Sequence, residues 1–126
     1  ATGIDAITLV VRTEQLATTR EQIFEDITAQ CRPNDIEIED GYSMIATVGQ
    51  GMQGRIGMAA RLCHALATEG ICIHLIDQGS PENNIIVGVR SDDHERAVRA
   101  IYAEFDEDTG IVEYSSIFEG ELAASV

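Results

Sequence analysis

The first 41 residues carry short apolar runs separated by polar turns. Ile7 to Val11 is rich in β-forming residues and predicts a strand. Thr18 and Thr19 precede an apolar set with helical spacing, and Glu21 and Gln22 follow at capping-box distance. These residues predict a helix that is capped at the two threonines and ended by the break at 33–34.

After this helix, the spacing of the apolar residues changes from a helical period to strict alternation. Ile36 and Ile38 alternate with glutamates, which predicts a half-buried strand. Asp40-Gly41 is a tight-turn dipeptide. Residues 1–41 therefore predict strand–helix–strand as a first segment.

The middle of the chain predicts a longer series of elements. Tyr42 to Val48 is a largely apolar strand, and Gly49 to Gly57 is a loop with four glycines. A helix is predicted from near Ile56 to Gly70, followed by strands at Ile71 to Ile76 and Ile85 to Val89. The predicted apolar face of this helix consists of Ile56, Ala59, Ala60, Cys63, Leu66 and Ala67.

A last helix is predicted after Asp92, which caps it with Glu95 at the third position. Its apolar stripe consists of Ala97, Val98, Ile101, Tyr102 and Phe105. Residues 42–105 thus predict β-α-β-β-α, an α+β sandwich of ferredoxin-like type. In the remaining tail, 106–126, residues 111–118 predict one more strand, and the last eight residues are expected to fray.

Composition narrows the class of partner. The 126 residues are 44% hydrophobic, enough for a core, and no apolar run is long enough to span a membrane. A formal charge of −14 repels phosphate backbones and anionic lipids, so we expect neither nucleic acid nor membrane as a partner. Three cysteines without a C-x-x-C pair are typical of a reducing compartment, which favours the cytoplasm.

The glycine-rich loop allows three interpretations. Gly49, Gly51 and Gly54 satisfy G-x-G-x-x-G between a strand and a helix, with Asp77 further on, as in a dinucleotide site. The chain is too short for a doubly wound domain, which argues against this interpretation. A glycine loop before a helix also leaves backbone N–H groups free for the carboxylate of an amino acid. The glycines could otherwise serve only a tight strand-to-helix connection.

Other candidate chemistry is weaker. Cys63, His64, Cys72 and His74 are possible metal ligands, but only the last two share a strand face. No nucleophile–base pattern surrounds the serines. We therefore predict no metal, no cofactor and no catalytic residues.

The middle segment resembles the ACT regulatory domains of aspartokinases, specifically their second ACT unit. The resemblance runs from about Ser43 to Phe105 and residues 4–40 resemble the second half of a preceding unit. Its motifs are V-G-Q-G-M at 48–52, G-M-A-A-R at 57–61, A-L-A-T-E-G-I at 65–71, I-D-Q-G-S-P-E-N-N-I at 76–85 and A-V-R-A-I-Y at 97–102.

The resemblance implies a ferredoxin-like ACT domain (βαββαβ, antiparallel, helices on one face) at 42–105, preceded by a partial ACT unit at 1–41. It implies a sensor of an end-product amino acid, lysine or threonine, with the effector lodged where ACT units pair in a homodimer. The implied effector-binding residues are Gln53, Gly54, Arg55, Ile56, Gly57, Cys72, Ile73, Gln78 and Ser80.

Two departures from the family pattern affect this site. Cys72 stands where family members usually have asparagine, whose amide hydrogen bonds a thiol cannot replace. Asp77 stands where they favour serine, and the carboxylate of Asp77 would suit a cationic ligand. No segment resembles the lysine-bearing motif of the aspartokinase catalytic domain, so we expect a regulatory fragment or subunit that acts on a catalytic domain in the same or another chain. The alternative function is a structural ACT-type dimerisation module that binds no effector.

Overall fold

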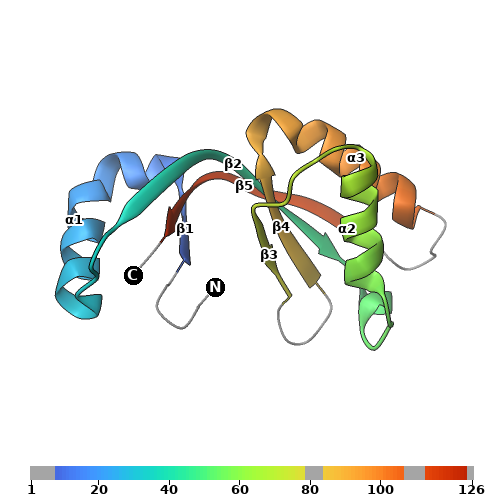
Figure 1. Ribbon diagram of the computed structural model, residues 1–126, viewed down its shortest axis with the longest axis horizontal. Coiled ribbons are helices and arrows are strands. Elements are labelled where there is room, and N and C mark those ends of the chain that lie inside the picture. The colour runs from blue at the N-terminus through green and yellow to red at the C-terminus, as the bar shows by residue number, and fades with distance from the viewer. Residues whose placement is uncertain (1–7, 79–83, 107–112, 125–126) are drawn as a thin grey trace. The chain divides into compact units, whose positions relative to one another are not determined.

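The computed structural model describes residues 8–78, 84–106 and 113–124 (Figure 1). It contains five strands and three α-helices, with two short 3-10 turns, in this part of the chain. In chain order they are β1 (Thr8–Arg12), α1 (Thr13–Cys31), β2 (Glu37–Val48), η1 (Gln50–Met52), α2 (Met58–Thr68), β3 (Leu75–Asp77), β4 (Asn84–Arg90), η2 (Ser91–Asp93), α3 (His94–Phe105) and β5 (Glu113–Ala124).

The chain divides into two compact units. Unit 1 comprises Ala1–Tyr42 and Glu119–Val126, and unit 2 comprises Ser43–Phe118. Strands β2 and β5 contribute to both. The strand order is β1-β5-β2 in unit 1 and β5-β2-β4-β3 in unit 2.

The pairing of β1 with β5 overturns one prediction. The last eight residues were expected to fray, but β5 extends to Ala124 and pairs antiparallel with β1, with Thr8 opposite Ala124. The backbone hydrogen bonds of this strand are satisfied by a segment more than a hundred positions away in the chain. No local pattern in the tail reveals that partner.

The start of α1 also differs from the prediction. The helix begins at Thr13, so Thr18 and Thr19 lie inside it and cap nothing. The Thr18 hydroxyl donates to the Glu14 carbonyl at 3.2 Å, and the Thr19 hydroxyl to the Gln15 carbonyl at 2.6 Å. Threonine satisfies its hydroxyl in this way within a helix. The end of the helix is as predicted: it closes at Cys31, before Pro33.

Asp40-Gly41 is not a turn. β2 continues through both residues as one strand of 12 residues. Gly41 has φ of +77°, a conformation that glycine adopts without strain. The strand changes there from exposed or half-buried residues to buried ones, which begin at Tyr42.

Unit 2 has the predicted β-α-β-β-α order, and both of its helices cover one face of its sheet. Alternate residues of the sheet enter a single apolar core: Ile45 from β2, and Ile85, Val87 and Val89 from β4. The helices add Met58, Leu62, Leu66, Ala97, Ile101 and Phe105 to the same cluster. Figure 1 shows α2 and α3 side by side over these strands. The predicted α+β class with an antiparallel sheet and helices on one face is confirmed.

The ends of the helices and strands in unit 2, and the face that α2 buries, differ from the prediction because tertiary contacts decide them. α2 buries Met58, Leu62, Ala65 and Leu66, so the predicted face was wrong by about one position, and Ile56, Ala60 and Ala67 are exposed. Of the predicted strand at 71–76, only the last two residues are in a strand, β3, which runs from Leu75 to Asp77 and pairs antiparallel with β4. Asp92 does not cap α3, which begins at His94 after the η2 turn without a side-chain cap.

Candidate functional site

The candidate site is the glycine-rich loop between β2 and α2. It begins where β2 ends at Val48, and its first half is a single 3-10 turn closed by the Met52 amide on the Gly49 carbonyl at 3.0 Å. The Met52 side chain is 3% exposed and belongs to the core of unit 2. The loop is therefore anchored at this residue, and the residues that follow stand outside the core.

The second half of the loop, residues 53–57, contains five of the predicted effector-binding residues and is exposed. Ile56 is fully exposed, which is unusual for a side chain of this type. Gly57 has φ of +86° at the N-cap of α2, and a Cβ atom there would meet nothing within 4 Å. Glycine is required at Gly57 by its backbone conformation and not by lack of space.

The loop leads into a helix end with free amide groups. The first helical hydrogen bond of α2 runs from the Arg61 amide to the Gly57 carbonyl at 2.9 Å. The amides of residues 58–60 have no carbonyl one turn earlier within the helix. The cap makes no side-chain hydrogen bond, and the first turn carries no acidic residue. Such a helix end attracts anionic groups, carboxylates among them.

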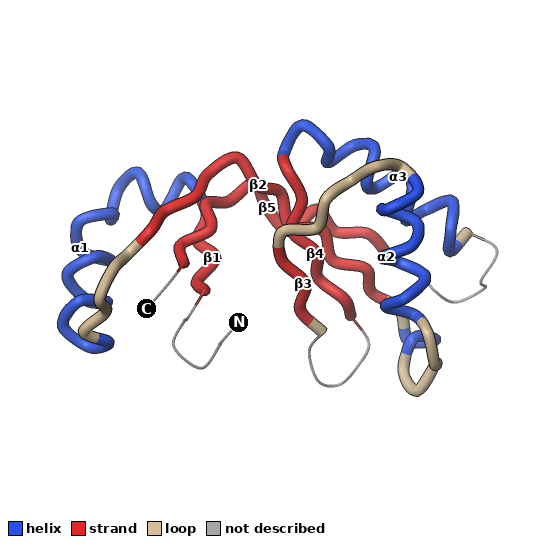
Figure 2. The backbone as a smooth tube through the Cα atoms, in the orientation of Figure 1, coloured by secondary structure: helices blue, strands red, loops and turns tan. Residues whose placement is uncertain are grey.

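The remaining predicted residues lie elsewhere in unit 2. Cys72 is exposed, Ile73 is half-buried against the core, and Gln78 is exposed after β3. Ser80 lies outside the described residues. In the chain, the loop precedes α2 and Cys72 follows it. Figure 2 shows a loop segment, in tan, at each end of α2. Because α2 has 11 residues, its ends are about 16 Å apart, so one chain does not bring these two groups together.

Two hollows that sequence reasoning did not single out lie on helices. One, of about 250 Å³, lies between α2 and α3 and is lined by His64, Ala65, Thr68, Glu69, Ala100, Ala103 and Glu104. Beside it, Arg61 bonds through Nε to the Glu104 carboxylate at 2.8 Å. The residues that line the hollow have the spacing of an ordinary exposed helix face. The sequence therefore predicts neither the hollow nor the contact between Arg61 and Glu104.

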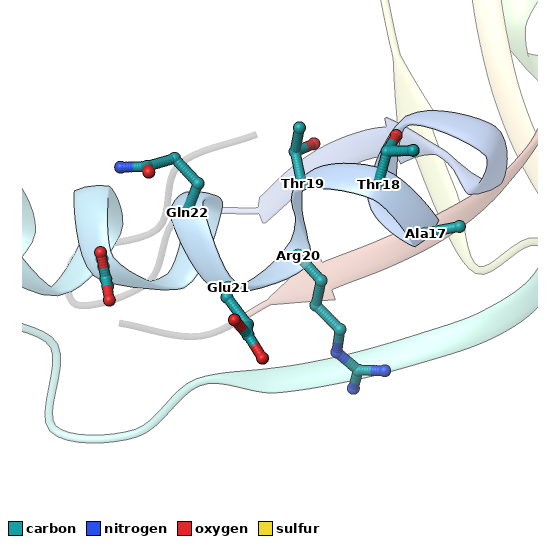
Figure 3. A pocket seen from close by; sticks show the side chains of 7 residues that line it. Ala17, Thr18, Thr19, Arg20, Glu21 and Gln22 are labelled. Atoms are coloured by element: carbon teal, nitrogen blue, oxygen red, sulfur yellow. The ribbon is translucent and has the colours of Figure 1, made fainter.

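The second hollow, of about 720 Å³, lies along α1 between Ala17 and Glu25. Figure 3 shows that its side chains diverge: Thr18 and Thr19 point to one side of the helix, and Arg20 and Glu21 to the other. Because these polar groups do not converge on one point, they do not form a binding site for a small ligand.

Within residues 8–78, 84–106 and 113–124, no group of three or more His, Cys, Asp or Glu side chains could hold a metal ion. Over the same residues, none of the helices is long and apolar enough to cross a membrane.

Comparisons with known proteins cover different parts of this chain. A family model described as ACT domain matches residues 45–105. Aspartokinase 3 of Bacillus subtilis (strain 168) is 32% identical over 104 residues, which are 82% of this chain and 23% of that protein.

Solved structures agree with this assignment. The crystal structure of Clostridium acetobutylicum aspartate kinase, described as an allosteric enzyme, matches with a TM-score of 0.76 and 42% identity over 83% of this chain and 24% of that one. The regulatory subunit of aspartate kinase from Thermus flavus matches with a TM-score of 0.57 over 73% of this chain and 60% of that one. At 22% identity, the latter is a likeness of fold alone.

The chain spans about a quarter of the length of the Bacillus and Clostridium proteins. The matched part contains both the glycine loop and the α2–α3 layer described above. Residues 45–105 of this chain therefore belong to the ACT-domain family, and the chain is similar to part of the aspartokinases.

Proposed function

We propose that this chain senses an end-product amino acid, lysine or threonine, and thereby regulates an aspartokinase. The observation that carries this proposal is the exposed loop at 53–57, which presents backbone groups beside the uncapped N-terminus of α2. Every amino-acid effector carries a carboxylate, and this end of the helix favours an anion.

The rest of the effector needs groups that this loop does not supply. Cys72 and Ile73 are the family-matched positions for such contacts, but they follow the far end of α2. An effector that touches both segments must therefore bridge two copies of the chain, each contributing one segment. Effector binding and subunit association are, on this proposal, parts of one event.

Strand β3 is a suitable edge for association. It lies at the end of the strand order, it is three residues long, and Ile76 is 46% exposed there although its pairing partner Val87 is buried. An exposed strand edge with an apolar side chain is a template for pairing with another chain. We therefore propose a homodimer formed through β3.

The experiment that tests effector binding is a thermal-shift screen of the twenty amino acids, repeated with Cys72→Asn. A ligand that binds only the folded state raises the melting temperature in proportion to its saturation. A selective shift with lysine or threonine supports the sensor. Silence in the original chain and in Cys72→Asn refutes it. Gly57→Ala, which strains the loop, is expected to abolish a shift, whereas Gly70→Ala, with a comparable φ of +69° at the other end of α2, should retain it.

The experiment that tests association is light scattering of the chain and of Ile76→Lys. A dimer that the substitution converts to a monomer supports pairing through β3, and a monomer in both cases contradicts it. A dimer with no response to any amino acid would favour the second candidate, a structural dimerisation module. The exposed Ile76 is the observation behind that alternative.

The proposed partner is an aspartokinase catalytic domain, in the same or a separate chain. The chain alone is expected to show no phosphorylation of aspartate. Its addition to a catalytic domain that lacks ACT units should make the kinase sensitive to the effector found in the screen. Aspartate phosphorylation by the chain alone would contradict this assignment.

A further inference from the structure

Two hydroxyl groups of β2 are buried in unit 2 without a hydrogen-bond partner. Ser43 and Thr47 are 1% and 0% exposed, and neither hydroxyl oxygen has a partner among the residues that the structure describes. A buried polar group that makes no hydrogen bond costs free energy, which an apolar side chain of similar shape avoids. Packing alone therefore does not explain why this strand carries hydroxyls at the two positions.

Both hydroxyls are on the side of β2 that faces the helices. Alternate residues of a strand share a face, and Ile45, which lies between them in the sequence, belongs to the core that α2 and α3 complete. Met44 points to the opposite face. Its side chain lies within 3.2 Å of the position of a Cβ atom at Gly88, and the neighbours of that glycine in β4 are core residues. The Thr47 hydroxyl therefore lies between β2 and the helical layer.

The two residues differ in their distance from the glycine-rich loop. Thr47 is the second-last residue of β2, whereas Ser43 precedes it by four residues, about 13 Å along the strand. Ile45 shares its cluster with Met52 of the loop and with Met58, the first residue of α2. Thr47 is two residues nearer to the loop than Ile45 on the same face. It therefore faces the start of α2, and Ser43 lies farther away.

The start of α2 lacks acceptors, and Thr47 lacks any partner. The amides of residues 58–60 have no carbonyl one turn earlier within the helix, and no side chain caps them. A carboxylate has two oxygens that accept several hydrogen bonds. One carboxylate at this end of the helix can thus accept from the amides and from a hydroxyl on the strand below. It would satisfy both sets of donors, which the chain by itself leaves unpaired.

We propose that Thr47 is a binding residue of the effector site and that its hydroxyl donates a hydrogen bond to the effector's carboxylate. The inference rests on the proposed amino-acid sensor and adds to it a residue that the resemblance to known regulatory domains did not indicate. Because Thr47 is fully buried, the carboxylate reaches it only when part of the loop moves. Residues 53–57 stand outside the core, so they can move without disrupting it.

Calorimetric titration of four forms of the chain with lysine and with threonine tests this role. Thr47→Val removes the hydroxyl and keeps the shape of the side chain, and Thr47→Ser keeps the hydroxyl. Ser43→Ala, the matched control, removes the other buried hydroxyl of the same face. We expect Thr47→Val to bind the effector about tenfold more weakly, because a hydrogen bond to a charged group is lost. Thr47→Ser and Ser43→Ala should bind as the original chain does.

Urea denaturation of the same variants separates binding from folding. Removal of a buried hydroxyl that has no partner stabilises the fold, so Thr47→Val should unfold at a higher urea concentration and still bind more weakly. A residue with a purely structural role would change the unfolding midpoint and leave the affinity unchanged. If circular dichroism shows that Thr47→Val does not fold, Thr47→Ala takes its place. If only Cys72→Asn binds an amino acid, the substitutions are made in that chain.

Three outcomes would overturn the role of Thr47. Equal affinity of Thr47→Val and the original chain removes Thr47 from the site and leaves the sensor intact. An equal loss of affinity in Ser43→Ala assigns the effect to β2 in general and not to this hydroxyl. Absence of binding in the original chain and in Cys72→Asn refutes the sensor itself, and the inference about Thr47 fails with it.

Discussion

Arg61 links the two helices of unit 2, and its replacement by alanine gives a sharp test of how that layer is held. Its Nε donates to the Glu104 carboxylate at 2.8 Å, and a terminal nitrogen donates to the Glu104 carbonyl at 2.9 Å. The guanidinium also lies 4.9 Å from the centroid of the Phe105 ring. One side chain of α2 thus makes three kinds of contact with the end of α3.

The magnitude follows from these contacts. The arginine and glutamate side chains are 38% and 31% exposed, so solvent weakens the ion pair to about 0.5–1 kcal/mol. The bond to the carbonyl adds about 1 kcal/mol, and the cation–π contact about 0.5–1 kcal/mol. Arg61→Ala is therefore expected to lower the free energy of unfolding by about 2–3 kcal/mol. For a unit of this size, that corresponds to a fall in melting temperature of about 10 °C or more.

The assay is urea denaturation followed by circular dichroism, with Arg99→Ala as the matched control. Arg99 also pairs with a glutamate, Glu95, but both side chains are 77% exposed and lie on one helix. Its loss is expected to cost less than about 0.5 kcal/mol. If Arg61→Ala is no more destabilising than Arg99→Ala, the link between α2 and α3 does not contribute as described. A double-mutant cycle with Glu104→Ala then isolates the pair itself.

Three further predictions concern single contacts. The Thr47 hydroxyl is buried and has no hydrogen-bond partner among the residues that the structure describes. Thr47→Val is therefore expected to raise the free energy of unfolding by about 1 kcal/mol, and a fall in denaturant midpoint would contradict this. A Cβ atom at Gly88 would lie 3.0 Å from Cε of Met44, so Gly88→Ala is expected to cost about 1–2 kcal/mol, and less when Met44→Ala opens space. A hydrogen bond with Asp106 raises the pKa of Tyr102, so ultraviolet titration should show one tyrosine ionising late, and Tyr102→Phe should remove it. The folded chain holds that proton more tightly, so the stabilising contribution is present below the ordinary pKa of about 10 and is lost as pH rises through the raised value; unchanged titration in Asp106→Asn would refute the cause.

Much of unit 2 could be read from local pattern. The order β-α-β-β-α over 42–105 follows from apolar periodicity. Each element buries one face, so the spacing of its apolar residues indicates whether it is a helix or a strand. The glycine loop was predictable for a different reason. Gly57, at the N-cap of α2, has a positive φ that few other residues adopt. Its motif matched a dinucleotide fingerprint, and the length of the chain argued against that function.

Tertiary structure decided what local pattern left open. Asp40-Gly41 has the composition of a turn, yet β2 runs through it, and Gly41 adopts its positive φ inside the strand. Cys72 and the loop are predicted to bind the same effector, and the length of α2 separates them within one chain. The end of the tail, up to Ala124, belongs to a strand because β1 pairs with it. Sequence records the preferences of neighbours along the chain, whereas strand pairing and the meeting of distant segments depend on which surfaces remain unsatisfied once the chain is folded.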